Sequence, residues 1–164
     1  MKPKQSGTAN REKLDSYYTC ELVINEIVSN SIFREMINDV KCVVDCSAGD
    51  DKFINEVKKQ FVNDSEIKTW SFDINPNADT VVKKDWFDVN ELPDKYILGL
   101  NPPFGRQSSL IRKFINHALQ INPPAAIVMV HPVKDTIIPS GYEELQSYDL
   151  KPNSFIRSKS GGVF

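Results

Sequence analysis

Long apolar runs are missing from this 164-residue sequence, and cysteine is scarce. No apolar stretch reaches the roughly 18 residues that a membrane-spanning helix requires, so we expect none. The first residues, 1–7, include two lysines but no apolar core behind them, and we expect no secretory signal. Cys20, Cys42 and Cys46 lack the paired spacing of a zinc site, which favours reduced thiols in an intracellular protein, either cytoplasmic or nuclear.

The remaining composition is typical of one folded domain. Hydrophobic residues make up 40% of the chain and charged residues 26%, which is enough apolar side chain for a core. We expect a polar, disordered leader over residues 1–13 and a single domain over residues 14–164. Residues 1–103 carry a net charge of −5 and residues 104–164 a net charge of +3. The C-terminal part is therefore better suited to face a polyanion such as nucleic acid.

Strand-like and helix-like segments alternate along the chain. Apolar residues recur at helical spacing from Leu14 to Ile37 and predict one or two helices, with Thr19 as an N-cap. Further strands are expected at residues 41–46, 67–73, 80–82, 96–100 and 125–130, and further helices at 53–62 and 108–120. This alternation predicts an α/β fold, a Rossmann-like doubly wound and mostly parallel sheet with helices on both faces.

Polar residues end or follow the predicted strands, namely Asp45, Asp73, Asp85, Asn101 and His131. Ligands of open α/β sheets bind beyond the carboxyl ends of the strands, so we expect a site there. At such a place Asp73 can accept hydrogen bonds from both hydroxyls of a ribose. Asp85 can accept from an adenine amino group, with Trp86 or Phe87 beside the ring; a turn acid without a ligand is the alternative.

Small residues follow the first strand in the run Asp45-Cys46-Ser47-Ala48-Gly49. Such a turn lets a ligand approach the backbone closely. The carboxylate of Asp45 disfavours a phosphate and suits a cationic group, such as the amino group of an amino-acid moiety. The phosphate-binding patterns of P-loops and of dinucleotide-binding turns are not met. An ordinary strand-to-helix turn is the alternative interpretation.

The strongest signal is Asn101-Pro102-Pro103-Phe104, directly after a predicted strand. Two consecutive prolines cannot continue a central ladder, so the carbonyl of Pro102 is expected to face a cleft beside the Asn101 side chain. These two acceptors can hold both hydrogens of a planar amine and direct its lone pair at an electrophile. The ring of Phe104 offers a stacking face for an extruded base. The alternative is a proline-rich loop without a ligand.

In this order the motifs resemble those of class I S-adenosylmethionine-dependent methyltransferases, and more narrowly the branch that modifies the N6 amine of adenine. The element Tyr17-Tyr18-Thr19 resembles the aromatic-x-Thr segment of that branch. Residues 43–155 are also similar to the methyltransferase-like domain of plant PHD-finger proteins of the enhanced-downy-mildew type. The run from Gly99 to Gly105 and the pair Asp85-Trp86 carry that similarity.

The resemblance implies S-adenosyl-L-methionine as cofactor, no metal, and methyl transfer to adenine N6 in RNA or DNA. It assigns catalysis to Asn101, Pro102, Pro103 and Phe104, and cofactor binding to Tyr17, Tyr18, Thr19, Asp45, Ser47, Ala48, Gly49, Asp73, Asp85 and Trp86. About 60 residues follow the Asn-Pro-Pro-Phe motif, too few for a separate recognition domain. Target choice is therefore expected to need a protein partner or a missing domain.

Two alternatives remain open at this point. Guanine N2 or a protein glutamine presents a planar amine like that of adenine, so the motif does not separate these acceptors. An inactive binding module is the other alternative, because Asp51 stands where most active relatives have a second glycine. Its side chain either crowds the cofactor or is tolerated there, as polar residues at this position in the plant group imply. The last antiparallel strand of the fold would begin at residues 161–164, so we expect either that the sequence is a fragment of a longer chain or that this strand is truncated.

Several further residues are weaker candidates. We interpret His131 as a spectator rather than a base, and His117 as a surface residue. Cys42 and Cys46 are expected to be core thiols. The basic side chains that could contact a phosphate backbone, or serve only solubility, are Arg106, Arg112, Lys113 and Lys134.

Overall fold

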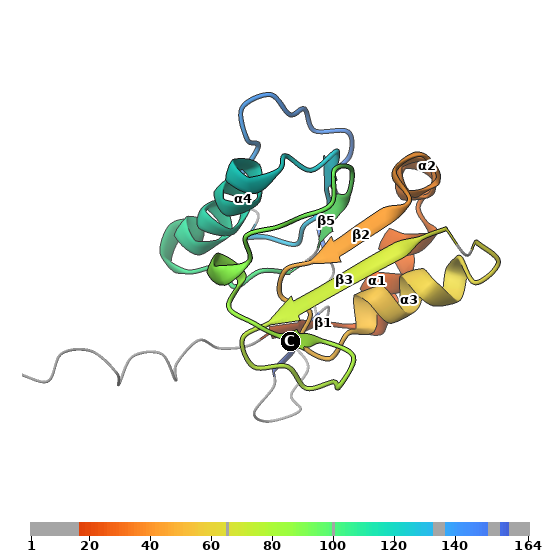
Figure 1. Cartoon of the computed structure of the whole chain (residues 1–164), viewed down its shortest axis with the longest axis horizontal. Coiled ribbons are helices and arrows are strands. Elements are labelled where there is room, and N and C mark those ends of the chain that lie inside the picture. Colours follow the sequence, from red (N-terminus) through yellow and green to blue (C-terminus); the bar gives the residue numbers. More distant parts are fainter. Residues whose placement is uncertain (1–16, 65, 100, 133–136, 151–154, 158–164) are drawn as a thin grey trace, which may run out of the picture.

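Five short strands form one parallel sheet in the order β4-β3-β2-β5-β6. They are β2 (Cys42–Asp45), β3 (Lys68–Asp73), β4 (Val82–Lys83), β5 (Ile97–Gly99) and β6 (Ala126–Ile127). The structure is a computed structural model that describes residues 17–64, 66–99, 101–132, 137–150 and 155–157 (Figure 1). From β2 the chain moves outward to β3 and β4, then crosses back to β5 and β6. This order confirms the predicted doubly wound, Rossmann-like fold.

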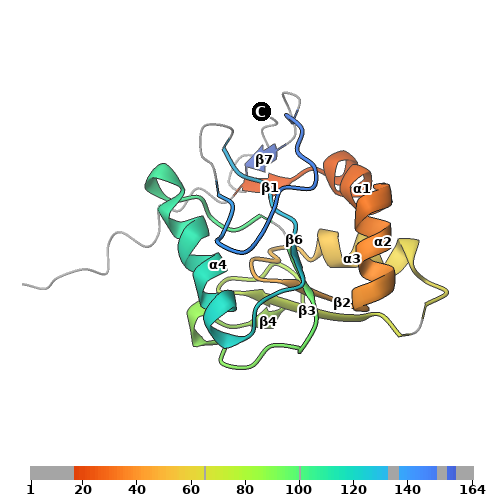
Figure 2. The same ribbon diagram turned by 90° about the horizontal axis from the view of Figure 1, so that it is seen from above.

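Helices cover both faces of the sheet (Figure 2). One face is covered by α1 (Glu21–Ser29), α2 (Ser31–Val40) and α3 (Lys52–Gln60), and the other by α4 (Ser109–Ile121) and the 3₁₀ helix η2 (Trp86–Asp88). Side chains of a strand point alternately to its two faces. Val43 accordingly belongs to the core beneath α1–α3, and its neighbour Val44 to the core beneath α4.

The N-terminal helical region is two helices, and the predicted N-cap at Thr19 is wrong. Cys20 precedes α1, whereas Thr19 belongs to β1 (Tyr17–Thr19), which pairs antiparallel with β7 (Phe155–Arg157). The backbone of Thr19 is paired with that of Phe155 and is therefore part of a strand. Asn30 separates the two helices and caps α2, because its side-chain oxygen accepts the N–H of Ile32 at 2.9 Å.

The strand predicted at residues 125–130 is shorter in the structure, where β6 covers only Ala126–Ile127. Its neighbour β5 ends at Gly99, and the prolines that follow cannot extend a ladder. Beyond Ile127, Val128 N–H still donates to Leu98 O at 2.8 Å. The predicted leader at residues 1–13 and the strand expected from residue 161 lie outside the described residues. Within the described ranges, no helix combines the length and apolar character needed to cross a bilayer.

Candidate functional site

The turn after β2 is held between the two neighbouring strands. Cys46 N–H donates to Gly99 O of β5 at 3.1 Å, and Ala48 N–H donates to Phe72 O of β3 at 2.9 Å. Asp45 is buried at the end of β2, and its Oδ1 accepts the N–H of Ser47 at 3.0 Å. These bonds fix the turn at the carboxyl edge of the sheet, where the predicted ligand site lies.

Tyr18 of β1 lies directly against this turn. Gly49 has φ +54°, and a Cβ built on it would come within 2.6 Å of Tyr18 Cε1, so the close approach requires glycine. The Tyr18 hydroxyl accepts a hydrogen bond from Asn77 Nδ2, in the loop after β3. Burial raises the pKa of Tyr18, and the nearby carboxylates of Asp50 and Asp73 raise it further. The structure therefore brings β1, the turn and the β3–β4 loop together.

Asp73 links the same elements from the end of β3. Its Oδ2 accepts the N–H of Gly49 at 2.9 Å, and its Oδ1 accepts the N–H of Asn75 at 2.7 Å. A carboxylate oxygen can accept more than one hydrogen bond, so both oxygens retain capacity for hydroxyl donors. The half-buried side chain faces the turn and fixes the backbone around Gly49.

Two hydroxyl groups in these segments are buried. Thr19 Oγ1 and Ser47 Oγ have no hydrogen-bond partner among the described residues, and Thr19 is only 5% exposed. An unsatisfied buried hydroxyl is costly and is rarely retained without a reason. Both residues belong to the predicted cofactor set. Polar groups of a ligand would satisfy these hydroxyls, so this part of the site fits a polar cofactor.

The segment after β4 contains two adjacent aromatic residues, whose different roles the sequence did not reveal. Asp85 precedes η2, and its Oδ1 accepts the N–H of Phe87 at 3.0 Å. Trp86 is 2% exposed, and its indole N–H donates to Phe114 O at 3.0 Å, so it is a core residue rather than a side chain beside a ligand. Phe87 is 41% exposed. Of the two predicted rings, Phe87 is the one accessible to a ligand near Asp85.

The Asn-Pro-Pro-Phe segment follows β5 at the same edge of the sheet. Pro102 is buried, whereas Asn101, Pro103 and Phe104 are half-buried. The ring of Phe104 packs partly against the apolar cluster under α4, and its carbonyl accepts the N–H of Leu110 at 3.2 Å. These contacts anchor the segment to the start of α4. Gly99 of β5 and the turn after β2 are joined by the bond from Cys46, so the two predicted halves of the site are neighbours.

Asp51 does not lie where the sequence comparison with active relatives led us to expect. Its side chain is 0% exposed, and its carboxylate accepts the hydroxyls of Ser71 and Thr80, each at 2.6 Å. The carboxylate is therefore enclosed by the protein and presents no charge to a ligand. The structure gives no support to crowding of the cofactor by Asp51, because its positive φ of 61° accompanies a side chain bound to β3 and the β3–β4 loop.

The two histidines have ordinary structural partners. His131 is half-buried, with Nδ1 3.0 Å from Pro132 O. His117 is half-buried rather than a surface residue as predicted: its Nε2 lies 2.8 Å from Val89 O, and its ring contacts those of Trp86 and Phe87 edge-on. The helix face that carries it packs against η2, which explains the burial.

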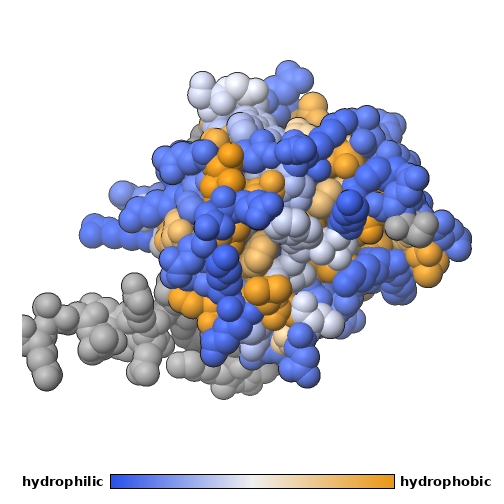
Figure 3. Space-filling model, viewed as in Figure 1, coloured by the Kyte–Doolittle hydropathy of each residue, from blue (hydrophilic) through white to orange (hydrophobic). Residues whose placement is uncertain are grey.

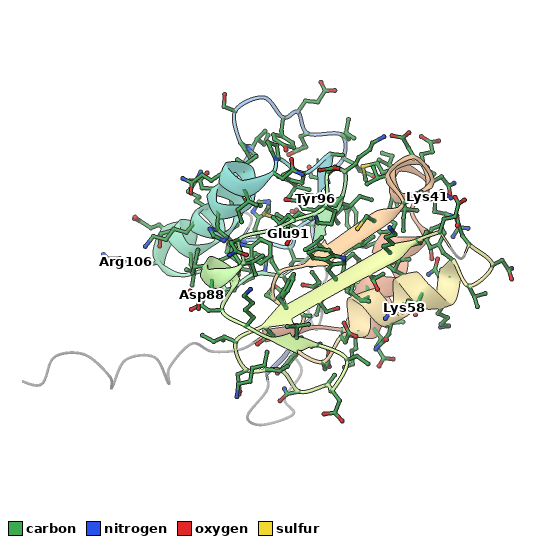
Figure 4. The ribbon with its side chains drawn as sticks, in the orientation of Figure 1. Lys41, Lys58, Asp88, Glu91, Tyr96 and Arg106 are labelled. Atoms are coloured by element: carbon green, nitrogen blue, oxygen red, sulfur yellow. The ribbon has the colours of Figure 1, made fainter. Side chains whose placement is uncertain are left out.

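The positions of the cysteines and of the described basic residues agree with the predictions from the sequence. Cys42 and Cys46 are buried as predicted, and burial raises the pKa of the Cys46 thiol well above its usual range. Arg106 projects outward beside the start of α4, where Lys113 is also exposed (Figure 4). Arg112 is exposed on the same helix, and Lys134 lies outside the described residues. Apolar patches on the face in Figure 3 are scattered among hydrophilic residues.

A hollow of about 380 Å³ lies at the outer edge of the sheet, between α3 and β3. Its lining includes Lys58, Trp70 and Val82, and no predicted site residue belongs to it.

The sequence did not indicate three polar residues near the turn, namely Ser71, Thr80 and Asn77. The pattern Asn75-Pro76-Asn77 after a strand is typical of a turn and was the available signal for Asn77. Ser71 and Thr80 carried no such signal, because their roles depend on the distant Asp51.

The family described as the EDM2 methyltransferase-like domain matches residues 36–151 of this chain. Protein ENHANCED DOWNY MILDEW 2 of Arabidopsis thaliana is 37% identical over 78 residues, which make up 45% of this chain and 5% of that protein. The similarity thus spans a small part of the relative. No solved structure matches the chain. Because the family match covers more than half of its length, the chain belongs to the EDM2 methyltransferase-like domain family.

Proposed function

We propose that this domain binds S-adenosyl-L-methionine and methylates the exocyclic N6 amine of adenine in RNA or DNA. Membership of a methyltransferase-like family supports the general class of reaction. The observation that carries the proposal is the bond between Cys46 N–H and Gly99 O, at 3.1 Å. Through it, the small-residue turn and the strand that leads into Asn101–Phe104 lie side by side at the carboxyl edge of the sheet, the edge at which open α/β sheets bind ligands.

The cofactor would be held by residues from three segments. The hydroxyls of Thr19 and Ser47, which have no partner among the described residues, are suited to the charged groups of its methionine end. Asp73 is suited to the ribose hydroxyls, and Asp85 with Phe87 to the adenine. When bound, S-adenosylmethionine supplies a methyl group on a positively charged sulfur, which an amine nitrogen can attack.

The acceptor amine would be positioned by the segment after β5. Asn101 Oδ1 and the Pro102 carbonyl each accept one hydrogen of the amine, which directs the nitrogen lone pair away from the ring plane. The half-buried Phe104 offers the open part of its ring to the base, while the apolar cluster under α4 holds the rest. As the nitrogen gained the methyl carbon, the bond between that carbon and sulfur would break, S-adenosylhomocysteine would leave, and the nitrogen would release one proton to solvent. This chemistry uses the positions of two acceptors and needs no strongly basic side chain.

One observation favours nucleic acid over a protein glutamine as the acceptor. Arg106 and Lys113 are exposed beside the Asn-Pro-Pro-Phe segment, on η3 (Arg106–Ser108) and on α4, and α4 has no acidic residue. A phosphate backbone would be attracted to this face, whereas a neutral glutamine side chain gains nothing from it. Guanine N2 remains the alternative acceptor in nucleic acid, because its amine is equally planar.

The test is methyl transfer by the full chain with radiolabelled S-adenosylmethionine. The substrates are RNA and DNA oligonucleotides that contain adenine, with matched oligonucleotides in which every adenine is replaced by uracil or thymine. We expect label only in the adenine-containing strands and N6-methyladenine in the digested product by mass spectrometry. Methylated guanine or methylated glutamine in the product would show that guanine N2 or glutamine, and not adenine N6, accepts the methyl group. Calorimetry without saturable cofactor binding would contradict the proposal and leave a non-catalytic binding module.

A further inference from the structure

An aspartate directly before a helix usually caps it, but Asp51 does not. The residue precedes α3, and its carboxylate accepts no N–H of that helix. Instead Oδ1 accepts the hydroxyl of Ser71 and Oδ2 that of Thr80, both at 2.6 Å. The side chain is completely buried, although burying a carboxylate is unfavourable unless it is strongly hydrogen-bonded. The two hydroxyl bonds are therefore what makes this position acceptable for a charged residue.

The backbone at Asp51 adds a second cost. Its φ is +61°, in the left-handed region, which is strained for residues other than glycine, although aspartate adopts it more often than most. A glycine would remove both the strain and the buried charge. A residue with these two disadvantages is compatible with a stable turn only if its carboxylate provides a compensating interaction. The structure identifies that interaction as the link from the start of α3 to β3 and to the β3–β4 loop (residues 74–81).

The β3–β4 loop is attached to the predicted cofactor site at three places. Asn77 N–H donates to Gly49 O at 2.8 Å, and Asn77 Nδ2 donates to the Tyr18 hydroxyl. Thr80 provides the third attachment, through Asp51. Asp73, whose carboxylate holds the N–H of Gly49, stands immediately before the loop. Only the Thr80 bond involves a charged acceptor, which makes it the strongest class of hydrogen bond among the three.

We propose that Asp51 is a positioning residue that keeps the β3–β4 loop against the Gly49 turn, and thereby presets Asp73 and Asn77 for the cofactor. The statement about the cofactor rests on the proposed function; the statement about the loop does not. Asp51 acts from within the protein and touches no ligand. Its bond to Thr80 controls the loop, whereas its bond to Ser71 joins α3 to a strand that the sheet already holds in place.

Two substitutions separate these bonds. Thr80→Val removes the loop attachment and leaves the bond to Ser71, whereas Ser71→Ala removes the strand attachment and leaves the loop. Each deletes one hydroxyl bound to the same carboxylate. Thr80→Ser retains the hydroxyl and serves as the conservative control. Thermal unfolding of all three variants establishes that they are folded.

The first readout is hydrogen exchange of the Asn77 backbone amide, measured by NMR in the full chain without cofactor. We expect exchange about tenfold faster in Thr80→Val and within twofold of wild type in Ser71→Ala and Thr80→Ser. Unchanged exchange in Thr80→Val, or the same increase in Ser71→Ala, would overturn the loop role of Asp51.

The second readout is the affinity for S-adenosylhomocysteine, measured by calorimetry. We expect Thr80→Val to bind about tenfold more weakly than Ser71→Ala. Equal affinities of the two variants, with a wild type that binds, would overturn the effect on the cofactor. A wild type that does not bind contradicts the proposed function itself, and the amide exchange then still decides whether Asp51 holds the loop.

Discussion

The ring of Tyr18 lies so close to Gly49 that a Cβ there would come within 2.6 Å of Tyr18 Cε1. Because Gly49 also has a positive φ, we expect Gly49→Ala to lower the free energy of unfolding by about 2–3 kcal/mol. Gly141→Ala is the matched control, since Gly141 has φ +87° with nothing within 4 Å of a built Cβ. It should lose only the backbone contribution, about 1 kcal/mol. Urea denaturation checks both variants, and equal losses would argue against the steric contact with Tyr18.

We expect Thr19→Val to lower the affinity for the cofactor without changing the stability of the fold. The hydroxyl of Thr19 is buried without a partner in the described structure, so its removal breaks no bond, and the free energy of unfolding should stay within about 0.5 kcal/mol of wild type. Affinity for S-adenosylhomocysteine should fall about tenfold, because one ligand contact is lost. Calorimetry together with urea denaturation checks this. An unchanged affinity would remove Thr19 from the cofactor site.

Trp86 and Phe87 are adjacent in sequence, but we expect their substitution to affect different properties, stability for Trp86 and cofactor affinity for Phe87. Trp86→Phe loses the bond to Phe114 O and leaves a partial cavity, so it should destabilise the fold by about 2 kcal/mol without changing cofactor affinity. Phe87→Ala removes a ring that is 41% exposed and should mainly weaken cofactor binding. The comparison uses thermal unfolding and calorimetry on both variants. A loss of affinity confined to Trp86→Phe would return Trp86 to the ligand site.

The raised pKa of Tyr18 predicts a pH dependence at the alkaline end. Burial and the charges of Asp50 and Asp73 disfavour the phenolate in the folded chain, whereas the unfolded chain ionises near pH 10. The contribution of Tyr18 to stability is therefore complete below pH 10 and decreases as the pH rises toward the raised value. Urea midpoints from pH 7 to 11 should fall less steeply in Tyr18→Phe than in wild type. Parallel curves would contradict this prediction.

The sequence predicted the sheet because its signals are local. The β-branched run at Cys42–Asp45 and the helical spacing of apolar residues at Ser109–Ile121 each identify one element, and the alternation of strands and helices determines how they are arranged. The strand predicted at residues 125–130 is longer than the observed strand, Ala126–Ile127, because the length of a strand depends on how far its neighbour pairs with it.

The site was harder to predict from the sequence where a side chain binds residues that are far away along the chain. Asp51 binds hydroxyls 20 and 29 residues further along the chain, and nothing in its local sequence indicates that its carboxylate turns inward. Trp86 and Phe87 are both aromatic, follow a turn acid and contact the ring of Phe114, so only the folded structure shows that Trp86 is 2% exposed and Phe87 41% exposed. The positions of Asp73 and Asn101, in contrast, follow from the strand ends alone.

The central claim is that Asn101 and the Pro102 carbonyl hold the acceptor amine. The most direct measurement is the rate of methyl transfer to an adenine-containing oligonucleotide by wild type and by Asn101→Ala, with S-adenosylhomocysteine affinity measured in parallel. The account predicts at least a hundredfold lower rate in Asn101→Ala with the same cofactor affinity, because positioning of the amine is lost and the cofactor segments are intact. Equal rates in the two proteins would contradict it.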